Sequence, residues 1–490
     1  MYIKEEVSIM SNTTQALSRI EAILDDSSFV EIGARVTART TDFNMQEKKA
    51  PSDGVITGYG VVNGNLVYVY SQDASVLGGT IGEMHAKKIA SLYEKAMKMG
   101  APVIGLIDCA GLRLQEATDA LNGFGEIYKN MSLASGIIPQ ITAVYGECGG
   151  GLAVLAELSD FVFVEEKKAK LFVNSPNALD GNYESKLDTS SAKFMAEAGV
   201  VDFVGDEETI ANGVRQLVSM LPSNNAEGTV CTDNQDDLNR VCQDMEAEIA
   251  DPALALTDIS DDGVFVEAKA EYAKEMVTGF ILVDGVTVGA VANRTALYDE
   301  NGEKAEEFAP VLTTAGAYKA AEFVTFCNAF EIPVLTLTNV KGFEATVKSE
   351  RTIAKAAAKL VYAFSNADVP KVNIITGEAY GSAYVAMNSK SIGADMVYAW
   401  PQASIGMMDA SLAAKIMYAD DIAASKDVTS TINEKAAEYA ALQSSVDQAA
   451  ARGYVDTIIN PEDTRKYVVA AFEMLFDKRE VRADKKHGTV

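Results

Sequence analysis

The stretch GECGGGLA, from Gly146 to Ala153, indicates how the chain folds, because a variant of it returns from Gly377 to Tyr384 as GEAYGSAY. In both places an apolar segment leads into a turn of small residues, and the sequence after the turn can form a helix. The two turns match at a spacing of 381 − 150 = 231 residues. This spacing predicts an internal repeat.

The same spacing pairs further residues around the two turns. Lys88 corresponds to Lys319, and the pairs with the strongest backbone demands are Pro102/Pro333, Pro139/Pro370, Gly111/Gly342, Gly146/Gly377 and Gly150/Gly381. Each copy predicts a helix (86–99 and 317–330), a buried strand (101–108 and 332–338) and a second strand before the turn (137–145 and 369–376). Upstream, 58–64 resembles 279–285 at a spacing of 279 − 58 = 221 residues.

The repeat predicts two homologous α/β domains, 1–240 and 241–490. A polar and acidic stretch at 222–262 is interpreted as the end of the first domain and a connector. The length of 490 residues agrees with two domains, and a hydrophobic content of 48% is enough for a core in each.

Charge and cysteine content restrict the classes of partner and compartment. A net charge of −28 would repel a phosphate backbone, which argues against nucleic acid as a partner. The five cysteines have no CxxC spacing, and residues 1–12 carry acids where a signal peptide needs an apolar run, so we expect a reduced, cytoplasmic protein. No charge-free stretch is long enough to span a membrane. With only His85 and His487 available, we expect no metal site.

The two glycine turns are the candidate sites of chemistry. Such turns direct consecutive backbone N–H groups from a helix N-terminus, where they can stabilise an oxyanion. The alternative interpretation is close packing of strand and helix. The tetrapeptide from Ala96 to Met99 (AMKM) is typical of biotin attachment, but it closes a predicted helix, so we expect Lys98 to be a solvated lysine at a helix C-terminus.

Beyond the repeat, the chain resembles the biotin-dependent acyl-CoA carboxyltransferases, in particular the propionyl-CoA carboxylase β subunits and the methylmalonyl-CoA decarboxylase α subunits. The motifs that carry the resemblance are DGVITGYG (53–60), LGGTIGEMHAKKI (77–89), DCAGLRLQE (108–116), CGGGLAVLAELSDFVF (148–163), AYGSAYVAMNSKSIGADMVYAWP (379–401), GYVDTIINPEDTR (453–465) and KKHG (485–488).

The resemblance implies two crotonase-like domains, with an acyl-CoA thioester bound mainly by the first and biotin by the second. It implies that biotin arrives on a separate biotin carboxyl carrier protein, and that a biotin carboxylase subunit or a membrane decarboxylase subunit is a further partner. It also implies a homo-oligomer, a hexamer of two stacked trimers, with active sites between the first domain of one subunit and the second domain of another.

The resemblance further assigns roles to individual residues. The N–H donors to the thioester oxygen would be Gly150 and Gly151, and the donors to biotin would be Gly381, Ser382 and Ala383. The residues expected to bind coenzyme A or biotin are Gly78, Gly79, Gly111, Arg113, Gly342, Phe343 and Tyr380.

Departures from the family pattern gather on the biotin side and leave alternatives open. The loop NVKGFEAT from Asn339 lacks the usual prolines, and Glu378 replaces a usual Lys or Arg. These changes support a second hypothesis, a non-catalytic scaffold subunit of a decarboxylase complex. A third hypothesis is a CoA hydratase or isomerase that uses Glu147 or Glu378 as acid or base. The acyl chain length, the direction of transfer and any sodium pump stay open.

Overall fold

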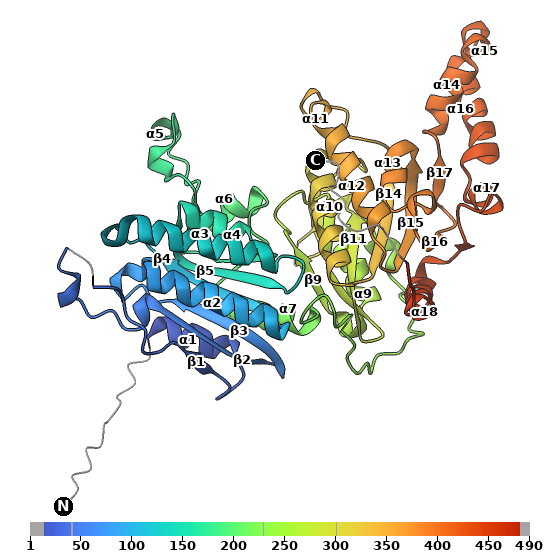
Figure 1. Ribbon diagram of the computed structural model, residues 1–490. Helices are drawn as coiled ribbons and strands as arrows, with labels where there is room; N and C mark the ends of the chain where they lie inside the picture. Colours follow the sequence, from blue (N-terminus) through green and yellow to red (C-terminus); the bar gives the residue numbers. More distant parts are fainter. Residues whose placement is uncertain (1–13, 41–42, 229, 300, 481–490) are drawn as a thin grey trace, which may run out of the picture. The chain divides into compact units, whose positions relative to one another are not determined.

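The computed structural model describes residues 14–40, 43–228, 230–299 and 301–480, and its contacts divide the chain into two compact units, Met1–Ser219 and Met220–Val490. In each unit, helices pack on one eight-stranded sheet (Figure 1). The predicted motif KKHG (485–488), His487 and residues 1–12 lie outside the described residues. Within the described ranges, no helix combines the length and the apolar character that a membrane crossing requires.

The sheet of unit 1 has the order β1-β2-β3-β4-β5-β6-β8, and β7 pairs with the end of β5. β1 to β3 are antiparallel, and β3 to β8 are parallel. The strands are β1 (Val30–Ile32), β2 (Val55–Val62), β3 (Asn65–Gln72), β4 (Val103–Cys109), β5 (Gln140–Gly149), β6 (Phe161–Glu165), β7 (Lys170–Phe172) and β8 (Phe203–Gly205). The helices are α1 (Gln15–Ile23), α2 (Glu83–Met99), α3 (Ala117–Ala134), α4 (Gly151–Glu157), α5 (Asn182–Ser185), α6 (Ala192–Glu197) and α7 (Glu207–Met220).

The sheet of unit 2 repeats this plan in the order β9-β10-β11-β14-β15-β16-β18, with β17 paired to β15. Its strands are β9 (Phe265–Ala268), β10 (Met276–Val283), β11 (Val286–Asn293), β14 (Val334–Val340), β15 (Lys371–Tyr380), β16 (Met396–Ala399), β17 (Ser404–Gly406) and β18 (Thr457–Ile458). Its helices are α8 (Met245–Glu248), α9 (Pro252–Ile259), α10 (Thr314–Ala329), α11 (Val347–Glu350), α12 (Ile353–Asn366), α13 (Gly381–Ala386), α14 (Ala410–Met417), α15 (Ala419–Ala424), α16 (Val428–Tyr439), α17 (Val446–Ala451) and α18 (Thr464–Leu475).

The predicted elements of both copies are present, with shifted ends. The strand predicted at 137–145 begins only after Pro139, which has no N–H to donate, and it runs on to Gly149 because β7 pairs with its last residues. The change in spacing from 221 to 231 also has a structural reason. Unit 2 carries an additional hairpin, β12 (Ala296–Tyr298) and β13 (Lys304–Glu307), between β11 and α10.

The repeated lysine has the same structural task in both units. The ammonium group of Lys88 donates to the backbone carbonyl of Ser52 at 3.1 Å, and that of Lys319 donates to the carbonyls of Lys269 and Tyr272, both at 2.8 Å. Burial lowers the pKa of Lys88 to about 8 and that of Lys319 to about 7. Each lysine therefore ties its helix to the segment that leads into the second strand of its sheet.

The acidic stretch 222–262 belongs to unit 2 and is not a free connector. The Thr232 N–H donates to the Gly285 carbonyl at 2.8 Å, which attaches the stretch to the turn between β10 and β11. The fully buried Arg465 donates to the Asp237 carbonyl and pairs with Asp261 at 2.6 Å. The contacts of the chain divide it between Ser219 and Met220, whereas the repeat predicts domains 1–240 and 241–490. Charged residues of the stretch form ion pairs within unit 2.

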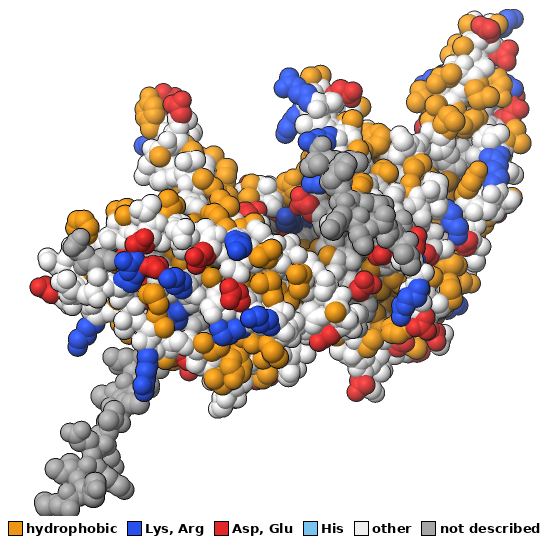
Figure 2. Space-filling model, viewed as in Figure 1, with side chains coloured by type: hydrophobic (Ala, Val, Ile, Leu, Met, Phe, Trp, Pro, Cys, Tyr) orange, Lys and Arg blue, Asp and Glu red, His pale blue; other side chains and the backbone are white. Residues whose placement is uncertain are grey.

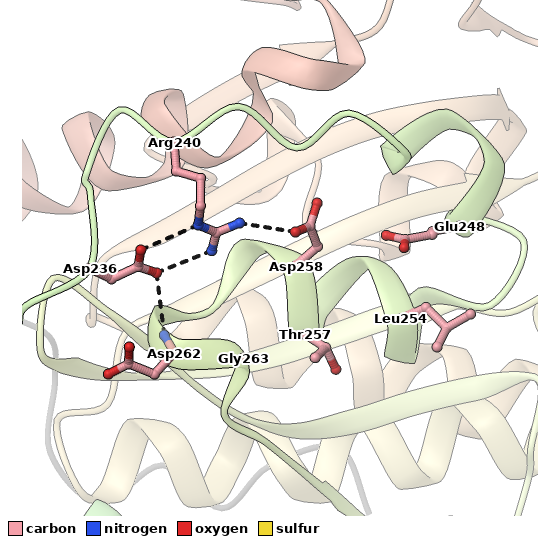
Figure 3. Close-up of a pocket in the computed structure, with 8 residues that line it drawn as sticks. All are labelled: Asp236, Arg240, Glu248, Leu254, Thr257, Asp258, Asp262 and Gly263. Atoms are coloured by element: carbon pink, nitrogen blue, oxygen red, sulfur yellow. Dashed lines mark hydrogen bonds and ion pairs between the residues drawn. The ribbon is translucent and has the colours of Figure 1, made fainter. Parts of the chain in front are cut away.

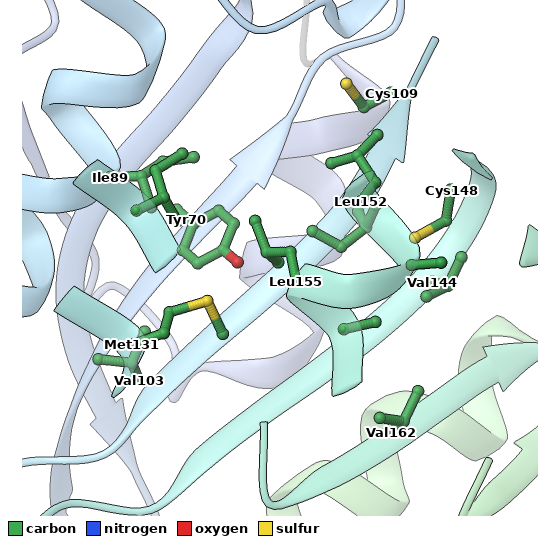
Figure 4. Packing of buried hydrophobic residues seen from close by; sticks show 14 of the residues in the cluster. Tyr70, Ile89, Val103, Cys109, Met131, Val144, Cys148, Leu152, Leu155 and Val162 are labelled. Carbon is green, nitrogen blue, oxygen red and sulfur yellow. The ribbon is translucent and has the colours of Figure 1, made fainter. Parts of the chain in front are cut away.

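The core of unit 1 holds the first glycine turn in place. Val103 and Val144 of the sheet pack with Ile89 of α2, Met131 of α3 and Leu155 of α4, and all five side chains are fully buried (Figure 4). The short helix α4 is therefore fixed against the end of β5, where the chain turns.

Candidate active site

The first glycine turn connects β5 to α4. Gly150 has φ +65° and ψ −126°, a conformation that essentially only glycine adopts, and a Cβ there would meet no atom within 4 Å. Its N–H donates to the Phe172 carbonyl of β7 at 2.8 Å. This bond departs from the predicted role of Gly150 as a free donor. Gly151 is the first residue of α4 and is exposed. At a helix N-terminus no preceding turn provides a carbonyl, so the Gly151 N–H has no acceptor within the helix.

Two aromatic side chains of α3 contact this turn at Gly151. A Cβ at Gly151 would lie 2.5 Å from the ring of Phe124, so only glycine fits there without a shift. The Tyr128 hydroxyl donates to the Gly151 carbonyl at 2.6 Å, and burial raises its pKa. The position of the first N–H groups of α4 is thus set by packing against α3.

The second glycine turn connects β15 to α13 and has the same form. Gly381 has φ +62°, and of the next two residues, Ser382 is exposed and Ala383 is buried. The buried Tyr380 donates its hydroxyl hydrogen bond to the Ser404 Oγ at 2.8 Å. Tyr380 thereby joins the turn to β17.

Loops at the carboxyl end of each sheet carry the other predicted residues. In unit 1 the Ile81 N–H donates to the Gly111 carbonyl, and the Arg113 N–H returns a bond to the Ile81 carbonyl, both at 2.9 Å. Gly78 and Gly79 precede this pair with φ of +67° and +64°. The structure brings these loops to the sheet edge at which β5 ends, because β3, β4 and β5 are parallel.

Unit 2 repeats the same pair of loops. The Leu312 N–H donates to the Gly342 carbonyl at 2.9 Å, and the Glu344 N–H donates to the Leu312 carbonyl at 3.0 Å, with Phe343 paired to Leu312. The altered stretch 339–346 is attached to β15 at its first residue. The side-chain oxygen of Asn339 accepts a hydrogen bond from the Glu378 N–H at 3.0 Å.

A buried ion network lies under the loops of unit 1. Arg113 is 2% exposed, and its guanidinium donates to Asp53, to Glu116 at 2.8 Å and to the Thr80 carbonyl at 2.6 Å. Glu116 also accepts from the Glu83 N–H at 2.7 Å, at the start of α2. Arg113 was predicted to bind coenzyme A or biotin, but the structure engages its guanidinium with the protein.

His85 connects this network to Gln72 at the end of β3. Its N–H donates to the Asp53 carboxylate at 2.8 Å, its Nδ1 lies 2.9 Å from the Asp53 carbonyl, and its Nε2 lies 3.2 Å from the Gln72 amide nitrogen. These contacts fit a neutral ring with the proton on Nδ1, and burial lowers the His85 pKa to about 3. Asp53, His85 and Glu116 all lie in the sequence motifs quoted above, so the sequence marks each of them as a residue of interest. Their separation along the chain gives no indication that they contact one another.

Cysteine chemistry at the first turn is disfavoured. Cys109 and Cys148 face each other across β4 and β5, and both are buried free thiols. Burial raises the pKa of Cys109 to about 12 and raises that of Cys148 as well, so both stay protonated near neutral pH.

Among the described residues, no group of three or more His, Cys, Asp or Glu is placed to hold a metal ion.

Two pockets accompany these features. In unit 1, a pocket of about 720 Å³ adjoins the turn and is lined by Glu147, Lys170, Phe172, Ser175, Pro176, Asn177, Asn182, Tyr183, Lys186, Leu187, Asp188 and Ser190. In unit 2, a pocket of about 410 Å³ contains Arg240 between Asp236 and Asp258, with bonds of 3.2 and 2.9 Å (Figure 3). No predicted site residue lines the second pocket.

Comparison with known proteins decides the family. A family model described as a carboxyl transferase domain matches residues 11–490. The chain belongs to the carboxyl transferase family. The methylmalonyl-CoA decarboxylase subunit alpha of Propionigenium modestum is 39% identical to it, over 98% of this chain and 93% of that protein. The propionyl-CoA carboxylase carboxyltransferase subunit of Haloferax mediterranei is 38% identical, over 97% and 93%.

A solved structure extends this relationship to the fold of the whole chain. Transcarboxylase 12S, described as a hexamer and solved with hydrolysed methylmalonyl-coenzyme A bound, superposes with a TM-score of 0.89 at 35% identity, covering 96% of this chain and 92% of that chain. These comparisons confirm the predicted fold of two tandem crotonase-like domains, the predicted family and the enzyme class of carboxyl transfer. The roles of individual residues stay predictions.

Proposed function

We propose that this member of the carboxyl transferase family is the carboxyltransferase subunit of a biotin-dependent acyl-CoA carboxylase or decarboxylase. It transfers CO2 between carboxybiotin and a short acyl-CoA of the propionyl-CoA or methylmalonyl-CoA type. The two matched glycine turns are the main support, because the reaction develops one oxyanion on the thioester and another on biotin. One such turn in each unit would supply the donors for these two oxyanions.

In unit 1, the proposed donor to the thioester oxygen is the N–H of Gly151. Gly150 contributes the backbone conformation and not its own N–H, which is bound to Phe172. Gly78, Gly79 and Gly111 lie in the neighbouring loops. Because glycine has no side chain, coenzyme A could approach the backbone closely at these three positions. The thioester would thus be held by main-chain groups.

In unit 2, the proposed biotin side consists of the turn from Gly381 to Ala383 with Gly342, Phe343 and Tyr380. Biotin, when bound, supplies the CO2 and accepts the α-proton of the acyl thioester, so the chain itself needs no acid or base. Ser382 is compatible with this role because a backbone donor does not depend on the side chain. The residues present therefore fit the group.

A purified complex tests the proposal. We expect the chain to copurify with a biotinylated carrier protein and to transfer CO2 from carboxybiotin on that carrier to propionyl-CoA, which leaves uncarboxylated biotin attached to the carrier. A complex that contains the carrier but shows no transfer in either direction would favour the scaffold hypothesis, which the altered loop at 339–346 motivates. Absence of any biotinylated partner would favour the hydratase hypothesis.

The assembly is a separate expectation. Because the site is proposed to combine two subunits, and because transcarboxylase 12S is described as a hexamer, we expect a homo-oligomer, a hexamer of two stacked trimers. Light scattering of the purified chain should give about six times its mass of 52.3 kDa. A stable monomer with full transfer activity would contradict this assignment.

Glutamate substitutions separate carboxyl transfer from hydration. Glu147 is exposed beside the first turn, and Glu378 is half-buried beside the second. If biotin accepts the proton, Glu147→Gln and Glu378→Gln should each keep most of the transfer rate from carboxybiotin to propionyl-CoA. If either carboxylate were the general acid or base, the loss would be about 100- to 10,000-fold.

The rate of crotonyl-CoA hydration serves as the parallel measurement for both variants. A well-folded Gln variant in which either rate collapses would place the proton transfer on the protein. That outcome would favour the hydratase or isomerase hypothesis over carboxyl transfer.

A further inference from the structure

A small pocket on the outer side of α2 in unit 1 has no part in the proposed reaction. It has a volume of about 210 Å³ and is lined by Ile32, Gly33, Val36, Thr57, Met84, Lys87, Lys88, Ser91, Leu92 and Lys95, a set called the α2 pocket below. On the face of unit 1 that carries α2, Lys and Arg side chains lie next to hydrophobic ones (Figure 2). The pocket thus combines an apolar wall with positive charge.

The positive charge of the α2 pocket is only partly neutralised. Lys87 pairs with Glu83 at 2.6 Å. Lys88 bonds to backbone carbonyls, and Lys95 bonds only to Ser91 of its own helix, so within the described part of the chain neither has a carboxylate within salt-bridge distance. Both lysines line the pocket, so they place positive charge at its wall.

The internal repeat shows which of these lysines the fold itself needs. Lys88 corresponds to Lys319, which makes the same carbonyl bonds, so this residue is structural. Ser91 corresponds to Glu322, which lies 3.5 Å from Lys269, and Lys95 corresponds to Phe326.

Phe326 packs on Phe330 with ring centroids 4.8 Å apart. In unit 2 these two positions therefore carry an ion-paired glutamate and a packed phenylalanine. Unit 1 has Ser91 and Lys95 instead, so the shared fold does not require a lysine at the second position.

The dimensions and the lining define the ligand class. A cavity of about 150 Å³ holds a molecule of six carbon atoms such as benzene, so the α2 pocket accommodates a chain of similar size with a small head group. Ile32, Val36 and Leu92 suit an apolar chain, and Lys95 with Ser91 suits a carboxylate. We infer that the α2 pocket binds a small organic monocarboxylate of about four to six carbon atoms, at a site separate from the two glycine turns.

Calorimetric titration of the full-length protein with hexanoate tests this inference. Hexanoate should bind at one site per chain, whereas hexanamide and inorganic phosphate should bind at least about tenfold more weakly, since one lacks the charge and the other lacks the apolar chain. Equal binding of hexanamide would overturn the inference. So would displacement of hexanoate by coenzyme A, because the pocket would then belong to the acyl-CoA site.

Variants of α2 locate the binding. Lys95→Gln should weaken hexanoate binding by about 10- to 100-fold, and Lys95→Arg should keep most of it. Lys98→Gln is the matched control, because Lys98 is exposed on the same helix and does not line the pocket. Equal effects of Lys95→Gln and Lys98→Gln, or unchanged binding in Lys95→Gln, would overturn the assignment.

Discussion

Replacing Arg113 by Gln is expected to lower the free energy of unfolding by about 3 to 5 kcal/mol, because it leaves two buried carboxylates without their cation. Asp53 is fully buried and Glu116 is 4% exposed, and both lie against the guanidinium. Burial alone already raises the Asp53 pKa, with Arg113 opposing that shift. Loss of Arg113 therefore removes the main compensation for burying these charges.

Urea unfolding of the purified protein measures this loss. Arg39→Gln is the matched control, since Arg39 pairs with Glu83 and Asp119 at the surface and is 41% exposed, so its removal should lower the free energy of unfolding far less than removal of Arg113. Arg113→Lys should recover only part of the stability, because an ammonium cannot reproduce the fork of bonds to Glu116 and Thr80.

The same variants decide what Arg113 does in the reaction. If it positions the loops, Arg113→Gln should reduce kcat and raise the KM for propionyl-CoA together, since both loops at the sheet edge move. If its guanidinium contacted coenzyme A directly, KM alone would rise while stability stayed near that of the parent. An Arg113→Gln protein of parental stability would contradict the buried network.

The repeat could be found from sequence because it rests on glycines and prolines. Gly150 and Gly381 both adopt positive φ, and both strands start directly after a proline, so the residues that match are those with backbone demands that few others satisfy. Lys88 and Lys319 matched for a similar reason, because each closes the same loop in its unit. Conformational constraints are therefore visible in one sequence.

Contacts between distant segments could not be found in this way. The bond from Gly150 to Phe172 depends on the three-residue strand β7, which no periodicity predicts. The Arg113 network joins residues 53, 80, 85, 113 and 116. Motif resemblance assigns Arg113 to a ligand, but it does not show which protein groups the guanidinium contacts. The acidic stretch at 222–262 reads as a connector for the same reason, since Asp236 and Asp261 pair with Arg465, more than 200 residues along the chain.

Replacing Gly150 by Val is expected to reduce kcat for carboxyl transfer by about 100- to 1000-fold, the usual cost of one oxyanion donor. The added side chain would meet open space, so overlap is not the cause. The cause is the backbone: a β-branched residue is strongly disfavoured at φ +65° and ψ −126°, so the turn must change and carry the Gly151 N–H away from the position proposed for the thioester oxygen.

Gly64→Val is the matched control for this variant. Gly64 also has positive φ, +84°, with no atom within 4 Å of its missing Cβ, but it lies in the hairpin between β2 and β3. Both variants should lose a similar stability of about 1 to 3 kcal/mol from backbone strain, and only Gly150→Val should lose turnover of propionyl-CoA. Undiminished turnover in a folded Gly150→Val protein would remove the first turn from the reaction, whereas an equal loss in both variants would assign the effect to stability.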